Sequence, residues 1–564
     1  MYSARSRARG FGGVSPPFQT EHAISLKPQL RAVPPAAPSH YSLARATILV
    51  MAATLASSVL GFAREVVSAR YYGTHWEMDS FLAAATIPTI LFGVFNGALV
   101  SALVPVFSDF VARGEDESAR RLASTVFNVL LIALSVLAVA GWFLAPYFVP
   151  IVAQGFAPQE LAMTIEMTRW FMPSVVATSL AGVVSAVLNA RNRFSASALA
   201  GIAINLVTIV CVLAFAQRLG IWALVLGTVL GLGAQLIVQM PAALRYRLYR
   251  PVIDVHHPGL AKIWVMLGPI VVGSAAGQLA IFFDRHFAST LTPGYIAGMN
   301  YATKLVGFPQ QIFAAAIATV IFPLLASQFA SANRAGVRRS VVTGLRLVNL
   351  VTIPSVCGLV VLARPIVSAL FERGEFRSTA TDLCSGLLPY AAIGLVGIAA
   401  SIVLTRCCFA CKETRWTVGI SVFTVLLNVA LSVAWLGTLG ARGLLLANSV
   451  SGALQAVLLF ALVWRLVHGL DWKTILGSAV RIGICSLAMM WALHWIASLG
   501  AHVEPSFAAR AWYLAGQLAI GSLVFVGSAW LLGVEELAIA VRLILQKFEG
   551  RVPSPPENRE APIA

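Results

Sequence analysis

The chain has 564 residues, of which 58% are apolar and only 11% are charged, and this composition excludes a soluble globular protein. Its formal net charge of +17 would suit a nucleic-acid-binding protein, but the basic residues lie in short segments between apolar runs, so no nucleic-acid partner is expected. We expect a polytopic membrane protein whose lysines and arginines fix its orientation.

The chain begins with a polar segment. Residues 1–43 contain five basic residues and six prolines but no apolar core of the length that a signal peptide needs. We predict that this segment is a disordered, basic cytoplasmic tail. Residues 536–564, where prolines and charges accumulate again, are predicted to form a second cytoplasmic tail.

Fourteen apolar runs follow, each long enough to cross about 30 Å of hydrocarbon. An even number of spans places both termini on the same side of the membrane. The connections on that side hold seventeen basic residues and those on the opposite side hold six, so the positive-inside rule predicts cytoplasmic termini. The six basic residues of the outer connections are Arg70, Arg218, Arg373, Arg377, Arg442 and Arg510.

An internal repeat relates two parts of the chain at an offset of 218 residues. The segment from Phe95 to Pro105 matches the segment from Phe313 to Pro323, and the double arginine at 120–121 returns at 338–339. Six spans separate the two copies, so both enter the membrane in the same direction. This is the arrangement of transporters whose halves are related by an axis along the membrane normal.

The predicted fold is therefore an all-α polytopic membrane protein with 14 transmembrane helices and both termini in the cytoplasm. Residues 44–250, with helices 1–6, and residues 251–468, with helices 7–12, would form two parallel-repeat six-helix bundles. Residues 469–535 would add two C-terminal helices.

Two charged residues, Arg64 and Glu65, lie in the middle of the first apolar run. A guanidinium near the centre of a bilayer costs about 2.5–3.5 kcal/mol, so such a residue normally faces the interior of a bundle or a hydrated cavity. Glu65 is expected to point elsewhere, because adjacent helix positions do not face each other. Polar and small residues at three- and four-residue spacing share the face of Arg64; they are Thr54, Ser57, Gly61 and Ser68.

Further charges occur at membrane depth in the second half. Asp284 and Arg285 lie toward the outer end of the seventh helix, and Lys304 lies in the eighth. In the eighth helix, Lys304 shares a face with Asn300, Gly307 and Gln311, and Pro309 then interrupts the helix.

These charges predict a cavity between the halves that is lined by Arg64, Arg285 and Lys304. Glu65, Asp79 and Asp284 would partly balance it, and a cationic pocket suits an anionic ligand. The alternatives are a solvated helix end at residues 284–285, a Lys304 side chain that snorkels to the interface, and a salt bridge from Arg64 to Asp79 or Asp284.

Asn428 and Ser432, one turn apart in the eleventh helix, could join Asp284 in a site for a cation with oxygen ligands. The alternative for each is a hydrogen bond between helices. Three neighbouring cysteines at 407, 408 and 411 resemble half of a zinc site, but no second Cys or His pair completes it, so no metal site is expected.

Enzyme motifs are missing from the sequence. It has no Gly-Lys dipeptide, and hence no P-loop for ATP, and no His-Glu-x-x-His metal helix. We expect a transporter without a cofactor, driven by an ion gradient, the membrane potential or the flux of its substrate. The coupling ion could be a monovalent cation, Na⁺ or H⁺.

Motifs spread over the chain resemble those of one transporter family. They are Val59-Leu-Gly-Phe-Ala-Arg-Glu65 with Asp79 downstream, Leu188-Asn-Ala-Arg-Asn-Arg-Phe194, Asp284-Arg-His-Phe-Ala-Ser289, and Tyr301-Ala302 followed by Phe308-Pro309. With these motifs the chain resembles the MurJ/MviN family of lipid II flippases, in the MOP superfamily, over roughly residues 43–535.

The resemblance implies a function. Members transfer lipid II, an undecaprenyl-pyrophosphate-linked peptidoglycan precursor, from the inner to the outer leaflet of the bacterial inner membrane. It also implies a cationic central cavity and a lipid-tail groove formed by helices 13 and 14. The expected partners are lipid II, or a similar undecaprenyl-linked glycan, and membrane lipids, and we expect a monomer.

Three segments depart from the family's pattern. Ser58 replaces an arginine, the segment 92–98 lacks the family's arginine and glutamate, and Thr303-Lys304 with Gly307 replaces an Asp-Arg pair and a glutamate. The sequence is therefore also compatible with a flippase for a different lipid-linked oligosaccharide. It is further compatible with a cation-coupled exporter of amphiphilic drugs from the same superfamily and with a membrane scaffold that has no transport activity.

Overall fold

The computed structural model describes residues 40–191, 193–245, 249–498 and 506–538. Contacts divide the chain into two units, Met1–Thr47 and Ile48–Ala564. The first unit contributes only the beginning of helix α1 to the described part, and the second is built from helices, with no strand among the residues described. Most of the two predicted tails therefore lies outside the described residues.

The helices follow one another with short connections. The first half contains α1 (His40–Tyr72), α2 (Trp76–Ala84), α3 (Thr86–Ala112), α4 (Asp116–Val152), α5 (Pro158–Ala190), α6 (Phe194–Leu219) and α7 (Trp222–Arg245). The second half contains α8 (Pro258–Ala288), α9 (Tyr295–Pro309), the π-helix η1 (Gln310–Ala314), α10 (Ala315–Ala330), α11 (Arg334–Val361), α12 (Ala363–Phe371), α13 (Ser378–Ile393), α14 (Leu395–Ala410), α15 (Arg415–Leu439) and α16 (Ala441–Leu466). Two helices complete the described chain, α17 (Trp472–Ser498) and α18 (Phe507–Leu531).

Many of these helices can cross a membrane. Eleven described helical segments are long and apolar enough, and α13 with α14, which meet at a bend of 42°, would make a twelfth. Helices α1 and α8, with 33 and 31 residues, also have the length of a span. The predicted all-α polytopic fold is confirmed, and the count of fourteen spans stays a prediction.

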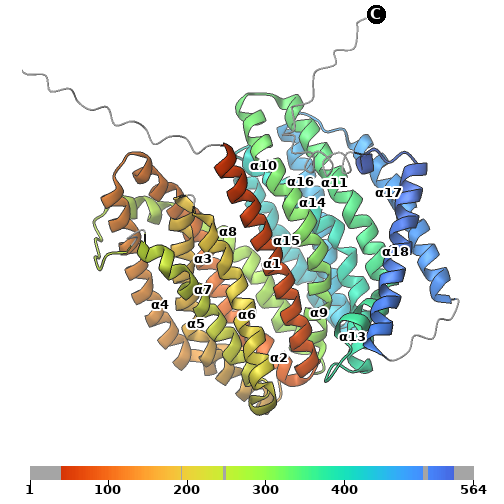
Figure 1. The fold of residues 1–564 in the computed structure, drawn as a ribbon, viewed down its shortest axis with the longest axis horizontal. Helices are drawn as coiled ribbons and strands as arrows, with labels where there is room; N and C mark the ends of the chain where they lie inside the picture. Colours follow the sequence, from red (N-terminus) through yellow and green to blue (C-terminus); the bar gives the residue numbers. More distant parts are fainter. Residues whose placement is uncertain (1–39, 192, 246–248, 499–505, 539–564) are drawn as a thin grey trace, which may run out of the picture. The chain divides into compact units, whose positions relative to one another are not determined.

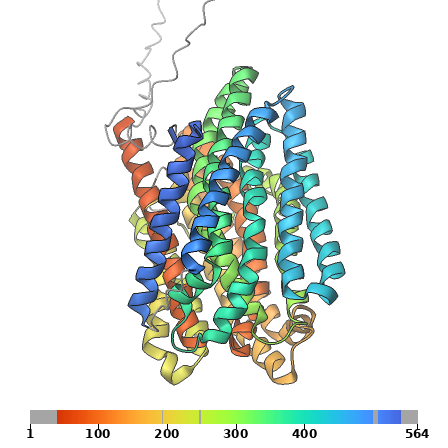
Figure 2. The same cartoon turned by 90° about the vertical axis from the view of Figure 1, so that its right-hand side faces the viewer.

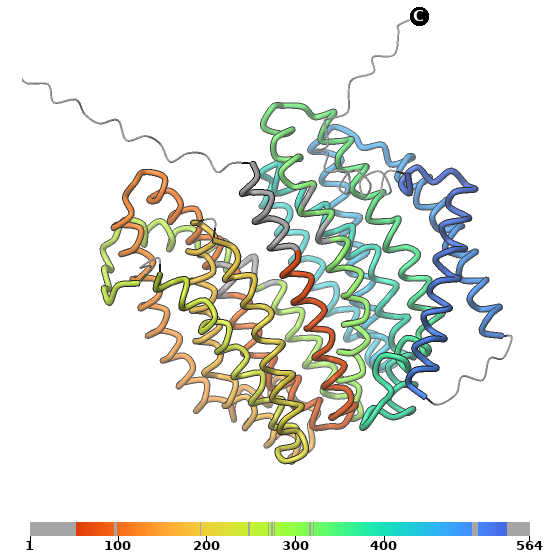
Figure 3. The backbone as a smooth tube through the Cα atoms, in the orientation of Figure 1, coloured from red at the N-terminus to blue at the C-terminus, as the bar shows by residue number. Residues whose placement is uncertain are grey.

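Within Ile48–Ala564, helices α3–α7 lie together on the left of Figure 1, and α9–α16 occupy its centre and right. The tube in Figure 3 shows the same division. Helix α8 packs against both α3 and α15 and so links the two groups. Helices α17 and α18 pack on each other and on α11 and α12 at one edge, which faces the viewer in Figure 2.

Four clusters of buried side chains hold the described helices together, the smallest of them around Ala145 in α4. One, which includes Phe107, lies among α3, α4 and α5, and another, which includes Leu325, lies among α10, α11, α14 and α16. The largest joins the two halves near the outer ends of α1, α9 and α12. At its centre the rings of Tyr301, Phe371 and Phe376 lie 5.2–5.6 Å apart, a spacing at which aromatic pairs attract each other.

Proline explains the break in the predicted eighth span. Pro309 has no N–H to donate and its ring crowds the preceding turn, so the regular α-helical ladder cannot continue through it. The next five residues, Gln310–Ala314, form a π-helix before α10 resumes. The interruption predicted at this proline is confirmed, and the neighbouring residues Phe308 and Gln311 line a cavity.

Candidate functional site

Two neighbouring cavities lie between the halves at the level of the buried charges. The central cavity has a volume of about 450 Å³ and is lined by α2, α3, α8, α9 and α16. The second cavity has a volume of about 250 Å³ and lies among α1, α6, α9 and η1. Lys304 lines both cavities, Asn300 lines the first and Gln311 lines the second. The face of the eighth span that was predicted from spacing therefore borders both cavities.

Arg64, Glu65 and Lys304 form a chain of charges on the wall of the second cavity. Arg64 Nη2 donates to Glu65 Oε1 at 2.9 Å, and Lys304 Nζ lies 3.8 Å from the same oxygen. The side chain of Glu65 is 9% exposed, whereas that of Lys304 is 47% exposed. The expectation that Glu65 points away from Arg64 is wrong, because the long arginine side chain bends along the helix surface and reaches its neighbour.

Asp284 and Arg285 lie on the wall of the central cavity, in α8. Asn448 Nδ2, from α16, donates to Asp284 Oδ2 at 3.3 Å. The other carboxylate oxygen of Asp284 is buried and has no hydrogen-bond partner among the described residues. A buried carboxylate oxygen normally needs a donor or a cation, so this atom is available to a ligand of the cavity.

Asp79 is buried in α2 and lines neither cavity. Its Oδ2 accepts a hydrogen bond from the Gly294 N–H at 2.5 Å, and its Oδ1 accepts one from the Ala297 N–H at 2.7 Å. Gly294 is the N-cap residue of α9 and has no side chain that could cap the helix. A carboxylate from one half therefore caps a helix of the other half.

Asn428 and Ser432 lie in α15, and the structure does not bring them to Asp284. Ser432 Oγ donates to Asn428 Oδ1 at 3.2 Å, and Asn428 Nδ2 donates to Ser451 Oγ at 3.4 Å. Ser451 Oγ in turn donates to the Asn448 carbonyl oxygen at 3.1 Å. The two residues thus support the helix segment whose Asn448 contacts Asp284.

Asn448 was not predicted from the sequence. It lies inside the apolar run of α16, with Ser449 and Ser451 close by. A cluster of polar residues within an apolar span is a signal that could have identified it, since such residues usually face a cavity or another helix.

The outer side of the two halves is closed by backbone contacts. The Tyr301 hydroxyl donates to the Gly73 carbonyl at 3.3 Å, and the Glu375 N–H donates to the Arg70 carbonyl at 2.9 Å. Gly73 and Gly294 have φ values of +54° and +95°, and a Cβ on either would lie 2.4–2.5 Å from a carbonyl oxygen of the opposite half. Only glycine permits this combination of conformation and close approach.

An apolar groove lies at the edge formed by α11, α17 and α18. Its volume is about 500 Å³, and Ile366 of α12, Phe313 of η1 and Leu537 also line it. Gln517 of α18 is its one buried polar side chain within the described residues, only 2% exposed.

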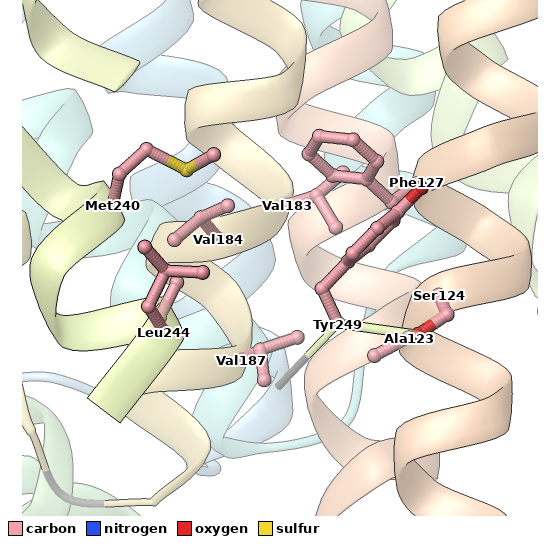
Figure 4. A pocket seen from close by; sticks show the side chains of 10 residues that line it. Ala123, Ser124, Phe127, Val183, Val184, Val187, Met240, Leu244 and Tyr249 are labelled. Carbon is pink, nitrogen blue, oxygen red and sulfur yellow. The ribbon is translucent and has the colours of Figure 1, made fainter. Parts of the chain in front are cut away.

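A further pocket lies among α4, α5 and α7. Figure 4 shows Phe127, Val184, Met240 and Tyr249 around it. Its volume of about 100 Å³ and its apolar lining do not suit a charged lipid head, so it is not a candidate for the transport pathway.

Comparisons with known proteins agree on one family. The model of the lipid II flippase MurJ family matches residues 68–510. The chain is 30% identical over 508 residues to a probable lipid II flippase MurJ of Vibrio cholerae, with 87% of this chain and 96% of the relative covered. It is 28% identical over 513 residues to the lipid II flippase MurJ of Burkholderia cenocepacia, with 87% of this chain and 98% of the relative covered.

Solved structures show the same fold. A lipid II flippase MurJ in an inward closed conformation superposes with a TM-score of 0.74 at 22% identity, and the match covers 86% of this chain and 98% of that one. An inward-facing multidrug resistance transporter of the MATE family, in the MOP superfamily, has a TM-score of 0.64 at 14% identity, and 75% and 98% of the two chains are covered.

Proposed function

This chain belongs to the lipid II flippase MurJ family, and we propose that it moves lipid II from the cytoplasmic to the outer leaflet of the bacterial inner membrane through its central cavity. The observation that carries the proposal is the set of cations between the two halves. Arg64 and Lys304 lie at one cavity and Arg285 and Lys304 at the other, at membrane depth. The chain is thus a transporter, and its substrate enters and leaves unchanged.

The physical obstacle to flipping is the head group. A pyrophosphate with sugars attached faces a prohibitive desolvation penalty in hydrocarbon. Guanidinium and ammonium groups replace water around phosphate oxygens through charge-assisted hydrogen bonds. Arg64 and Lys304 would hold the pyrophosphate in this way, and Arg285 would meet it in the central cavity.

The acidic residues play a different part in this proposal. Glu65 keeps Arg64 and Lys304 in place while the cavity is empty, and Asp79 holds the outer side closed through α9. Opening to the outside would require the cap of α9 to break while contacts form on the inner side. The two halves would then rock about the cavity, as parallel repeats allow.

The groove formed with α17 and α18 suits the lipid tail. A polyprenyl chain is wholly apolar, as is nearly all of the groove lining. The head would travel through the cavities while the tail remained in contact with apolar side chains and membrane lipid. Because one chain carries both halves and the groove, we propose that it acts as a monomer.

We also propose a coupling site for a monovalent cation, Na⁺ or H⁺, at Asp284. Its unpartnered Oδ1 and the neighbouring Asn448 support this assignment. Asn428 and Ser432 would act behind Asn448 by fixing the position of α16.

The test is lipid II translocation in proteoliposomes that contain the purified full-length chain. Arg64→Ala is expected to lower the rate at least about tenfold, because a charge-assisted hydrogen bond contributes about 1.5–3 kcal/mol. Arg218→Gln, an exposed arginine that lines neither cavity, is the matched control and should flip lipid II at the wild-type rate. Unchanged flipping by a folded Arg64→Ala protein would remove the pocket assignment. If the protein preferred another undecaprenyl-linked glycan over lipid II, the transport function would stand and the assigned substrate would be that glycan.

A further inference from the structure

Four of the six basic residues predicted for the outer connections gather at one place. Arg70 lies in the last turn of α1, Arg373 and Arg377 lie between α12 and α13, and Arg510 lies in the first turn of α18. The positive-inside bias makes basic residues rare on this side of a membrane protein. We call this group of four residues the outer arginine cluster.

Backbone and side-chain contacts bring the cluster together. The Glu375 N–H bonds the Arg70 carbonyl at 2.9 Å, and a Cβ on Gly374 would lie 3.1 Å from Arg70 Cγ. Arg510 Nη1 lies 3.2 Å from Glu372 Oε1. Arg70 and Arg510 are 440 positions apart in the sequence. Both nevertheless border the connection between α12 and α13 that carries Arg373.

The cluster has more positive than negative charge in the part of the chain that the structure describes. Its four arginines face two carboxylates, those of Glu372 and Glu375, which pair with Arg510 and Arg377. Burial and the positive charges of Arg70 and Arg510 lower the pKa of Arg373. An anion bound here would relieve the repulsion between these arginines.

Arg373 is held in a fixed orientation. Its Nη2 donates to the Leu370 carbonyl at 2.7 Å, and its guanidinium carbon lies 4.3 Å from the centre of the Phe507 ring. Its Nε is buried and has no hydrogen-bond partner among the described residues. A fixed guanidinium loses little entropy when it binds a phosphate.

The cluster lies just beyond the outer end of the apolar groove. Ile366 lines the groove seven residues before Arg373, and Gln517 lines it seven residues after Arg510. At 1.5 Å per helical residue, the interval in α18 corresponds to about 10 Å, and α12 ends at Phe371, two residues before Arg373. Helices α12 and α18 pack against each other, and Figure 1 shows the outer end of α18 beside α13.

We propose that the outer arginine cluster binds the diphosphate of a polyprenyl lipid in the outer leaflet while the lipid tail occupies the groove. The inference rests on the proposed function and adds a second phosphate site, which receives the head group after it leaves the central cavity. Paired guanidinium groups recognise phosphate oxygens with directed hydrogen bonds. An anionic phospholipid offers the same phosphate chemistry and is the competing ligand.

The test measures binding of geranylgeranyl diphosphate, a short polyprenyl diphosphate, to the detergent-purified full-length chain by native mass spectrometry. The variant is Arg70→Gln with Arg377→Gln, because both side chains are exposed and neither substitution touches the backbone contacts. Binding should weaken about fivefold, since each exposed charge pair contributes modestly, and the effect should shrink at high salt. Arg218→Gln is the matched outer control and should bind as the wild type does.

A second variant, Arg64→Ala with Lys304→Ala, distinguishes binding at the outer arginine cluster from binding at the central cavity. In this background the proposal expects residual binding, which weakens about fivefold when Arg70→Gln and Arg377→Gln are added. Loss of all binding with the cavity substitutions alone would overturn the outer site and leave the flippase proposal intact. Binding of cardiolipin with no binding of geranylgeranyl diphosphate at the cluster would overturn the assignment to a polyprenyl diphosphate. Failure of the wild type to flip lipid II would refute the proposed function without removing the binding result.

Discussion

Replacing Asp79 by alanine should loosen the outer closure of the transporter. The Asp79 carboxylate comes from α2, yet it accepts the N–H groups of Gly294 and Ala297 at the start of α9, at 2.5 and 2.7 Å. These bonds join the two halves, so the proposed opening of the outer side would have to break them. Their loss should therefore change the balance between conformations and not only the stability of one helix.

The size of the effect follows from capping energetics. Removing an N-cap side chain costs about 0.5–2 kcal/mol, and the upper end applies here because Asp79 is 3% exposed and satisfies two donors. A loss of about 2 kcal/mol in the closed state shifts the equilibrium about thirtyfold toward the outward-open state. Asp79→Asn keeps one acceptor oxygen and should produce a smaller shift, about fivefold.

Thiol accessibility from the outside measures this shift. Met299 lines the central cavity and is 8% exposed, so Met299→Cys should react with a membrane-impermeant maleimide only when the outer side opens. The seven native cysteines, most of them buried, give the background labelling. This background is measured in the protein that lacks the Met299→Cys substitution. Equal labelling rates with and without Asp79→Ala, in proteins that remain folded, would refute the capping argument.

Substitutions at Lys304, Gly73 and Glu536 test three further features of the structure. Lys304→Met should reduce lipid II flipping at least about tenfold while Lys304→Arg retains most of it, as measured in proteoliposomes, and equal activity of the two would show that charge at this position is unnecessary. Gly73→Ala should lower the melting temperature more than Gly114→Ala, because both have positive φ but only the Cβ at 73 meets a carbonyl oxygen, at 2.4 Å. Burial alone would raise the pKa of Glu536, but hydrogen bonds from Arg346 and Ser478 lower it from its ordinary value. This carboxylate therefore stabilises the fold above the ordinary pKa of a glutamate, and the contribution is lost as the pH falls through the lowered pKa of the folded state. Glu536→Gln should flatten the acid side of the pH-stability curve.

The sequence predicted those features that depend on local periodicity. Apolar runs located the membrane helices, and helical spacing placed Asn300, Lys304 and Gln311 on one face because the α-helical repeat fixes which side chains lie together. Pro309 marked a break for an equally local reason, its missing N–H. These are properties of a single helix and need no knowledge of its neighbours.

Features that depend on contacts between distant segments could not be predicted in this way. Asp79 meets the start of α9 across 215 residues, and no periodicity indicates that its carboxylate caps a helix instead of lining a cavity. The pairing of Arg64 with Glu65 was missed because helix geometry fixes the Cβ direction and leaves a long side chain free to bend. Contact of Asp284 with Asn448, and not with Asn428, likewise depends on how α8 and α16 pack.

The balance of charge at the two cavities explains how a phosphate could be bound and still released. Among the described residues that line the cavities, three cations, Arg64, Arg285 and Lys304, face two carboxylates, Glu65 and Asp284, so the cations outnumber the carboxylates by one. Lys304 is the more loosely held partner of Glu65, at 3.8 Å and 47% exposed, whereas Arg64 lies at 2.9 Å. An incoming pyrophosphate would therefore draw Lys304 away first, while Glu65 keeps Arg64 paired and avoids an uncompensated buried charge. Because part of the attraction would be offset by the broken Lys304–Glu65 contact, the proposed binding of the head group would be weaker than binding by free cations, and release at the outer side would restore that contact.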